Sequence, residues 1–434
     1  MIKLIFLLAA MGTVYGEICD VFPRVAESET ETVTDKVTGR EIRFLTNGDY
    51  MNCHSYPHNR SWLEDDKYVM IESSRPRPEG TWKAACGEED PYFRQERQLL
   101  AVNIDDGRIY HLATLEMEDT SKYAGHLSMS SQYHADYAPG SNTVIYYDMS
   151  GHNLYMLDLT NGKRKRIMHV PDGTIGDPPT ISRDGTRAVA YIDYPGPAEN
   201  KQFFGRTTVM YAFDLNGIEL TKSPYIINTF VQQVYKEMRI APCHTVINPV
   251  NPDEVSYCHG FRDRSDGSVL KSRIWYSKID GSLVKLANIT PDGHIFTHEI
   301  WGPQGKYIYY VDIVEKGCVR RVEPRTGEVE QVFGDITPRC LHISLSGDEN
   351  LVVYETQTYD SKGNPLDKYG NHDEWLAVYN VKTGKHTRLA RFREGLHHPR
   401  HCHPRINLEG TKVVFTTGHG YNSRVAYMEI DNID

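Results

Sequence analysis

Long apolar runs are absent from this 434-residue sequence beyond its first segment, and none there approaches the roughly 20 residues that a membrane-spanning helix needs. We therefore expect no membrane insertion. Basic residues are fewer than acidic ones, since the chain has 48 Lys and Arg residues and 58 Asp and Glu residues, which gives a net charge of −10. A nucleic-acid partner is not expected, because phosphate binding needs a basic face. Eight cysteines in this length are too sparse for a disulfide scaffold.

Familiar hydrolase and nucleotide-binding motifs are missing as well. The sequence contains no G-x-S-x-G, no Walker loop and no H-E-x-x-H. Its many carboxylates could supply the acid pair of a glycoside hydrolase, but nothing in their spacing selects two of them. Hydrolysis is therefore the weaker enzyme hypothesis.

The first segment, residues 1–16, has the pattern of a cleavable export signal. Lys3 precedes the apolar run Leu4 to Met11, and small residues stand at the −3 and −1 positions before Glu17. We therefore expect a periplasmic or secreted protein whose mature chain, residues 17–434, forms one domain. The cysteines of such a chain could pair, and the sequence leaves open both Cys243 with Cys258 and Cys318 with Cys340.

A unit of two alternating strands, each followed by a polar turn, recurs seven times along the chain. The first strands of the seven units are WLEDDKYVMIE, APGSNTVIYYD, ISRDGTRAVAYID, NPVNPDEVSYCHG, GPQGKYIYYVD, LSGDENLVVYET and LEGTKVVFTTG. Period-two alternation with Gly-containing turns is typical of hairpins, and each unit alone leaves an apolar face uncovered. Radial repetition of four-stranded sheets covers such faces, which predicts an all-β, seven-bladed β-propeller.

The seventh unit stops after VAYMEI and is one strand short. The early segment GREIRFLT, Gly39 to Thr46, has a strand-like composition and lies outside the seven units. We predict that this N-terminal strand completes the last blade and closes the ring.

Histidines recur just before the first turn of several units. His298 lies 305 − 298 = 7 residues before the turn glycine Gly305, and His403 lies 410 − 403 = 7 residues before Gly410. In a propeller such positions converge at one mouth of the central channel, although they are far apart in the sequence. Histidines in comparable places are His54, His134, His244 and His342.

The densest of these signals is His398-Pro-Arg-His401-Cys-His403. Residues i and i+2 of a strand share one face, so His401 and His403 can both point to the channel, with His398 reaching the same place from the preceding loop. Together with His298, four imidazoles could surround one divalent cation. Imidazole ligands suit Mn²⁺, Fe²⁺, Ni²⁺ and Zn²⁺, and the spacing does not choose among them.

The strings TPDGHIFTHEIWGPQGKYIYYVD and HHPRHCHPRINLEGTKVVFTTG resemble the metal-binding segments of oligogalacturonate lyases, polysaccharide lyase family 22. The resemblance extends from about Gly39 to the C-terminus. It implies a seven-bladed propeller, a β-elimination from 4-linked uronates, and Mn²⁺ bound by His298, His401 and His403. His398 stands where the family has a metal-binding Gln, which leaves Zn²⁺, Fe²⁺ and Ni²⁺ open beside Mn²⁺.

The resemblance also implies a catalytic base and a substrate-binding arginine. Removing the proton next to a uronate carboxylate needs a base with a pKa near neutrality, for which histidine is suited. The family's base corresponds to His244, with His259 as the second choice. Its arginine, which pairs with a substrate carboxylate, corresponds to Arg206, with Arg239 and Arg400 as substitutes. The expected partner is a uronate-containing oligosaccharide, and the protein is expected to be a monomer or a small homo-oligomer.

Two rival hypotheses share the propeller fold. One is a lyase of the ulvan or rhamnose-glucuronate kind, with a base among His126, Tyr133 and His134 and a purely structural metal. The other is a non-catalytic, TolB-like binding platform, whose repeats share turns such as ISRDG. A platform has no need for four histidines at one mouth, which favours the enzyme.

Overall fold

The computed structural model describes residues 17–76, 96–116, 134–176, 178–194, 206–216, 225–232, 241–260, 273–291, 294–313, 317–334, 336, 339–357, 374–392, 402–417, 423–431 and 433. The predicted export signal, residues 1–16, lies outside this part of the chain. The described residues form strands apart from one short helix, α1 (Ile18–Val21). No helix among them is long and apolar enough to cross a membrane.

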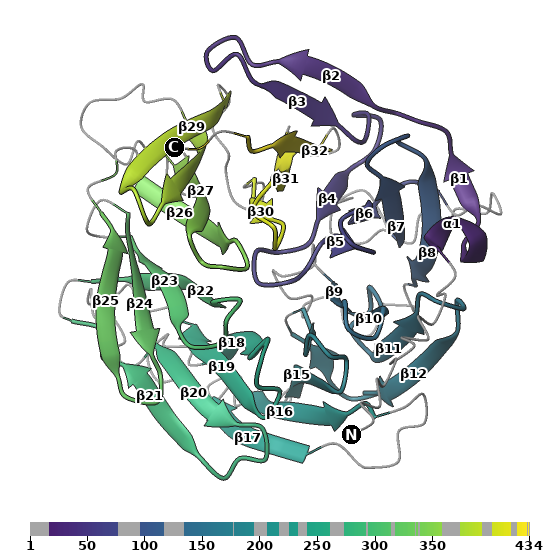
Figure 1. Ribbon diagram of the computed structural model, residues 1–434. Helices are drawn as coiled ribbons and strands as arrows, with labels where there is room; N and C mark the ends of the chain where they lie inside the picture. Colours follow the sequence, from purple (N-terminus) through teal and green to yellow (C-terminus); the bar gives the residue numbers. More distant parts are fainter. Residues whose placement is uncertain are drawn as a thin grey trace, which may run out of the picture.

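Seven antiparallel sheets stand in a ring, which confirms the seven-bladed propeller (Figure 1). Blade 1 contains β4 (Asn52–His54), β5 (Trp62–Leu63), β6 (Tyr68–Ser73), β7 (Arg97–Asn103), β8 (Ile109–Leu115) and, at its outer edge, β1 (Arg24–Ala26). Blade 2 contains β9 (Ala135–Ala138), β10 (Thr143–Tyr147), β11 (Asn153–Asp158) and β12 (Arg164–His169). Blade 3 contains β13 (Thr174–Ile175), β14 (Thr180–Ile181), β15 (Arg187–Tyr194), β16 (Arg206–Asp214) and β17 (Tyr225–Gln232).

The later blades follow the same order from the channel outward. Blade 4 contains β18 (Ala241–Ile247), β19 (Glu254–Gly260), β20 (Ile274–Lys278) and β21 (Val284–Asn288). Blade 5 contains β22 (Phe296–Trp301), β23 (Ile308–Asp312), β24 (Cys318–Glu323) and β25 (Glu328–Phe333). Blade 6 contains β26 (Arg339–Leu345), β27 (Leu351–Gln357), β28 (Glu374–Asn380) and β29 (Lys385–Phe392).

Blade 7 is built from both ends of the chain. It contains β30 (Arg405–Ile406), β31 (Lys412–Thr417), β32 (Arg424–Glu429), β3 (Glu41–Phe44) and β2 (Glu31–Thr34). The N-terminal strand β3 pairs antiparallel with β32, so that Phe44 lies opposite Ala426. This pairing confirms the predicted closure of the ring, and β2 adds a fifth strand that the sequence pattern did not predict.

The hydrophobic core is divided among the junctions between blades rather than gathered at one centre. Seven clusters of buried side chains each join two neighbouring blades. At the junction that closes the ring, Val414 and Val425 of blade 7 pack with Val69 and Leu100 of blade 1. The apolar face that each unit leaves uncovered is therefore buried by the next unit. Cys340, buried between blades 5 and 6, carries a thiol, so the Cys318–Cys340 disulfide is absent.

All inner strands begin at the same end of the channel because every blade repeats the same antiparallel order. We call this end the histidine mouth, after four histidines of the inner strands. His244, His298 and His342 lie within the first four residues of β18, β22 and β26, and His403 lies two residues before β30. The end at which the inner strands finish and their first turns lie is called the opposite mouth.

The inner edge of blade 1 departs from this regular pattern. Both β4 and β5 pair with β6, and residues 55–61 between them leave the sheet. This excursion carries Tyr56, His58 and Arg60 along the channel. A chain segment that makes no ladder hydrogen bonds has no period-two signature, which explains why the alternation did not predict it.

Three histidines of the mouth adopt left-handed backbone conformations. The φ angles of His244, His298 and His403 are 50°, 55° and 45°. The register of the inner strand also shifts around His244 and His298, as it does around His342. A left-handed residue other than glycine costs about 1–2 kcal/mol, and such strain gathers at functional sites, where the surrounding structure holds the residue in place.

Glycine adopts such a φ without strain. At a left-handed position the glycine variant should therefore be more stable than the alanine variant, the reverse of the usual order. We expect His298→Gly to be more stable than His298→Ala by about 1 kcal/mol, because only glycine adopts this φ without cost. At His342, which is not left-handed, the alanine variant should be the more stable. Urea unfolding of the four variants in the presence of a chelator measures this. The same order at both positions would contradict the argument.

Candidate active site

Four imidazoles from four consecutive blades face one another at the histidine mouth. The ring centroids of His298 and His342 are 3.8 Å apart, and those of His342 and His403 are 4.3 Å apart. His244 lies further along the ring, 6.3 Å from His298. Two imidazoles bound to one ion about 2.1 Å away, at right angles to each other, would have centroids roughly 4.5 Å apart. The centroid spacings of the two neighbouring pairs, His298 with His342 and His342 with His403, are close to this value, so the members of each pair are near enough to contribute to one cation site.

Tyr56 from blade 1 enters the middle of this group. Its ring centroid lies 5.5 Å from that of His244 and 5.2 Å from that of His403, and its hydroxyl oxygen is 3.5 Å from His244 Nε2. His58 follows at 5.7 Å from His244. Burial lowers the pKa of His58 well below its ordinary value, and the nearby His244 acts in the same direction, so the ring is neutral near pH 7.

The rings nearest the cation position are oriented by acceptors behind them. His298 Nδ1 lies 2.7 Å from the Leu341 carbonyl oxygen, and His342 Nδ1 is hydrogen-bonded to Glu355 Oε1. The other oxygen of Glu355 accepts from the backbone amides of Cys402 at 2.7 Å and His403 at 3.2 Å. In both rings Nδ1 faces the acceptor, so Nε2 is the atom turned to the mouth, as is typical of metal-binding histidines.

Glu355 is the group that connects blades 6 and 7 at this site. Its side chain is buried, with an exposed fraction of 1%. Burial raises the pKa of Glu355 to about 8, against the opposing hydrogen bonds from Cys402 and His403. Cys402 itself points into the core between the two blades, and burial raises the pKa of its thiol.

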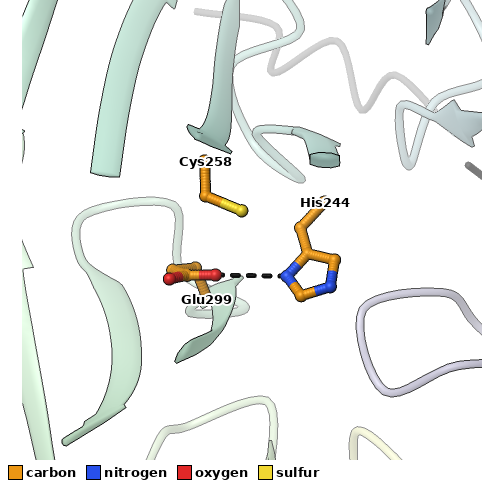
Figure 2. A group of neighbouring side chains, drawn as sticks. All are labelled: His244, Cys258 and Glu299. Atoms are coloured by element: carbon orange, nitrogen blue, oxygen red, sulfur yellow. Dashed lines mark hydrogen bonds and ion pairs between the residues drawn. The ribbon is translucent and has the colours of Figure 1, made fainter. Parts of the chain in front are cut away.

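His244 is held by a buried ion pair of its own (Figure 2). Its Nδ1 donates to Glu299 Oε2 at 3.1 Å, and both carboxylate oxygens of Glu299 are bound by the Arg273 guanidinium. Burial alone would raise the pKa of Glu299, but Arg273 and His244 outweigh it and hold the pKa below its ordinary value. The permanently ionised Glu299 fixes the proton of His244 on Nδ1 and leaves Nε2 as the basic nitrogen, on the side of Tyr56.

A second grouping with metal-binding chemistry includes the same histidine. One ligand atom each of His244, Cys258 and Glu299 lies within 4.8 Å of the others (Figure 2). Arg273 already places its positive charge on both oxygens of Glu299. A cation there would meet that charge directly, so the arrangement fits an oriented base better than a metal site.

His54 and His134, which occupy comparable positions in other blades, have structural roles. His54 is 1% exposed and bridges the Thr416 hydroxyl, at 2.8 Å, and the His403 carbonyl oxygen, at 2.7 Å; burial lowers its pKa to about 4. His134, also 1% exposed, donates from Nδ1 to Glu72 at 2.8 Å. Glu72 also contacts Arg97, at 3.5 Å. This buried network disfavours His134 as a base that meets a substrate.

Several predicted site residues lie outside the described part of the chain. These are the proposed metal ligands His398 and His401, the rival base residues His126 and Tyr133, and the substitute arginines Arg239 and Arg400. For Arg206 and His259 the structure describes the backbone only. Arg206 begins β16, the third strand of blade 3, at the edge nearest the histidine mouth, and His259 is in β19 directly after Cys258.

Reasoning from the sequence passed over Tyr56, Glu299 and Glu355, and noted His342 without assigning it a role. His342 carried a usable signal, because it lies 349 − 342 = 7 residues before the left-handed turn residue Glu349, as His298 does before Gly305. The other three had none, since their roles depend on neighbours from different blades.

Comparison with known proteins agrees with the architecture. A solved oligogalacturonate lyase from Vibrio parahaemolyticus superposes with a TM-score of 0.71 at 17% identity, covering 95% of this chain and 99% of that one. An oligogalacturonate lyase solved in complex with manganese gives 0.70 at 18% identity, covering 95% and 98%. At these identities the likeness establishes the seven-bladed fold.

Sequence relatives extend over most of the chain. The oligogalacturonide lyase of Pectobacterium atrosepticum is 21% identical over 400 residues, 89% of this chain and 92% of the relative. The oligogalacturonate lyase of Dickeya dadantii is 24% identical over 408 residues, again 89% and 92%. A family model described as oligogalacturonate lyase matches residues 93–429. This chain, with its ring of histidines at one mouth of a seven-bladed propeller, belongs to the oligogalacturonate lyase family.

Proposed function

We propose that the protein cleaves short 4-linked uronate oligosaccharides, oligogalacturonides in the first place, by metal-dependent β-elimination at the histidine mouth. The observation that carries the proposal is the buried Arg273–Glu299–His244 relay, which presents one basic imidazole nitrogen beside a cluster of three further imidazoles. The family membership and the manganese complex of a relative support the same chemistry.

His244 acts as the base in this proposal. Its Nε2 takes the proton from C5 of the uronate, and the electron pair of that bond forms a C4–C5 double bond. The C4–O4 bond breaks with its electrons going to oxygen, which takes a proton from solvent and leaves as the hydroxyl of the released sugar. Glu299 stabilises the imidazolium that forms, through the hydrogen bond to Nδ1 and without taking the proton itself. A buried carboxylate is well suited to this, since its negative charge is already compensated by Arg273.

The donor set at the mouth fits a divalent cation of the borderline kind. His298, His398, His401 and His403 are the proposed ligands, and His342, which lies beside both His298 and His403, is a fifth candidate. When bound, a divalent cation, Mn²⁺ before Zn²⁺, Fe²⁺ or Ni²⁺, would neutralise the uronate carboxylate and so stabilise the charge that develops on it.

Two further features of the chain belong to the proposal. Arg206, at the start of β16, is proposed to pair with a substrate carboxylate, and residues 1–16 are proposed to direct export to the periplasm or the medium. The rival base His134 is disfavoured by its burial against Glu72. The binding-platform hypothesis gains no support from a chain that belongs to a lyase family.

Activity should depend on the metal. We expect incubation with defined galacturonate oligomers to produce the ultraviolet absorbance of a double bond conjugated to a carboxylate. Chelation should lower the rate by about 100-fold or more, and added Mn²⁺ should restore it, because charge neutralisation supplies several kcal/mol. Unchanged activity in the metal-free protein would contradict the proposal.

Replacement of the base should separate the two candidate histidines. We expect His244→Ala to lose about 10²–10⁴-fold in kcat, the usual contribution of a general base. His134→Asn, which keeps a donor for Glu72, should stay within about threefold of the parent because His134 meets no substrate. Full activity in His244→Ala would remove the assignment. Glu299→Gln should lower kcat by about 10–100-fold with little change in KM, since it removes the negative charge that stabilises the imidazolium and fixes the proton of His244 on Nδ1.

Manganese affinity should depend on His342. Because His342 lies between His298 and His403, we expect His342→Ala to weaken Mn²⁺ binding about tenfold or more, measured by the electron paramagnetic resonance signal of free Mn²⁺ during a titration. His111→Gln is the control, since His111 belongs to β8 in blade 1 and hydrogen-bonds to Gln98. Equal affinities in the two variants would exclude His342 from the site.

A further inference from the structure

A separate cavity of about 50 Å³ lies in the channel toward the opposite mouth. Its walls include Pro249 and Pro303, which follow the inner strands β18 and β22, so it belongs to the end of the channel where those strands finish. His58 is the lining residue next to the catalytic cluster, since its ring centroid lies 5.7 Å from that of His244. The cavity is therefore distinct from the proposed substrate site.

The lining of this cavity carries more basic than acidic side chains. Arg60, Arg183 and Arg405 line it together with one acid, Asp136, which leaves 3 − 1 = 2 positive charges in excess. Asp136 is 1% exposed and already committed to Arg60, with Asp136 Oδ2 3.0 Å from Arg60 Nη2. Asp136 Oδ2 also accepts from the Ile181 amide. The negative charge of Asp136 is thus already paired with Arg60 and does not compensate Arg183 or Arg405.

Arg183 and Arg405 face the cavity without a carboxylate partner in the described part of the chain. Arg183 Nε is buried and has no hydrogen-bond partner among the described residues. Arg405 donates to the Pro57 carbonyl, a neutral acceptor. Burial lowers the pKa of Arg405 to about 10, with Arg60 acting in the same direction, and burial likewise lowers the pKa of Arg183. The positive charge of Arg183 also lowers the pKa of Arg405, so the two guanidinium groups repel each other.

His58 adds an independent indication of a ligand. The residue is 92% buried, since its exposed fraction is 8%, and neither ring nitrogen has a hydrogen-bond partner among the described residues. A buried imidazole without a partner loses the free energy of hydration and gains nothing in return. A neutral imidazole at the wall of a basic cavity can donate its one N–H to an anion.

We propose that the opposite mouth binds a compact inorganic anion, such as chloride, between Arg183 and Arg405 and below His58. Both arginines are half-buried and line the same cavity, so an anion between them would form charge-assisted hydrogen bonds with two guanidinium groups. Since about 10–15 Å³ of such volume holds one water molecule, the cavity has room for a few water-sized groups, which suits a small ion better than a sugar ring. The anion joins blades 1, 3 and 7, from which His58, Arg183 and Arg405 come.

The test compares thermal unfolding of the full chain in sodium chloride and in sodium gluconate at the same ionic strength, with inorganic phosphate as a further arm. Chloride should raise the melting temperature by about 2–5 °C at saturation, whereas the bulky gluconate should not. Arg405→Gln should lose the chloride effect. Arg187→Gln is the control, because Arg187 pairs with Asp214 at 2.7 Å and does not line the cavity, so it should keep the effect.

Crystals soaked in bromide give a second measurement that needs no variant. The expected result is an anomalous peak in contact with the Arg183 and Arg405 side chains. Equal melting temperatures in chloride and gluconate, or crystals without bromide at this place, would overturn the proposal. An effect of phosphate alone would overturn the assignment to chloride while keeping an oxyanion site. A chloride effect retained in Arg405→Gln would place the anion elsewhere.

Discussion

The constraint on which the molecule depends is that seven inner strands must start at one end of a closed ring. Each blade buries its apolar face only against its neighbours, so the ring is stable once the N-terminal strand β3 has paired with β32. Closure then fixes which residues are neighbours in the channel. The ring centroids of Tyr56 and His403, which are far apart in the sequence, lie 5.2 Å apart because the excursion from blade 1 carries Tyr56 into the channel that His403 faces from blade 7.

In the proposed mechanism, the role of each histidine depends on the carboxylate to which it is hydrogen-bonded. Glu299 is paired with Arg273 and stays ionised, so it serves to orient the base His244. Glu355 holds His342 and the backbone of His403 on one oxygen each, which suits a support for metal ligands. Glu72 binds His134 inside the blade junction and removes it from the mouth. In the proposed mechanism, one residue type at equivalent places thus has structural, basic and ligating roles according to its partner.

Much of the fold could be predicted from sequence because its signals are local. Alternation and turn residues gave all seven blades and the closing strand, and the spacing of His298 and His403 from their turns put them at one mouth. The excursion that carries Tyr56 and His58 was missed, because a segment outside the sheet has no period. Glu299 and Glu355 were missed because their partners come from other blades, and β2 because short outer strands bury little.

The central claim, that imidazoles of separate blades surround one cation at the histidine mouth, is tested most directly by diffraction from crystals grown with Mn²⁺, recorded at the manganese absorption edge. The account predicts one strong anomalous peak about 2.1–2.3 Å from ring nitrogens of both His298 and His403. A peak between His244, Cys258 and Glu299 instead, or no peak at the mouth at all, would contradict it.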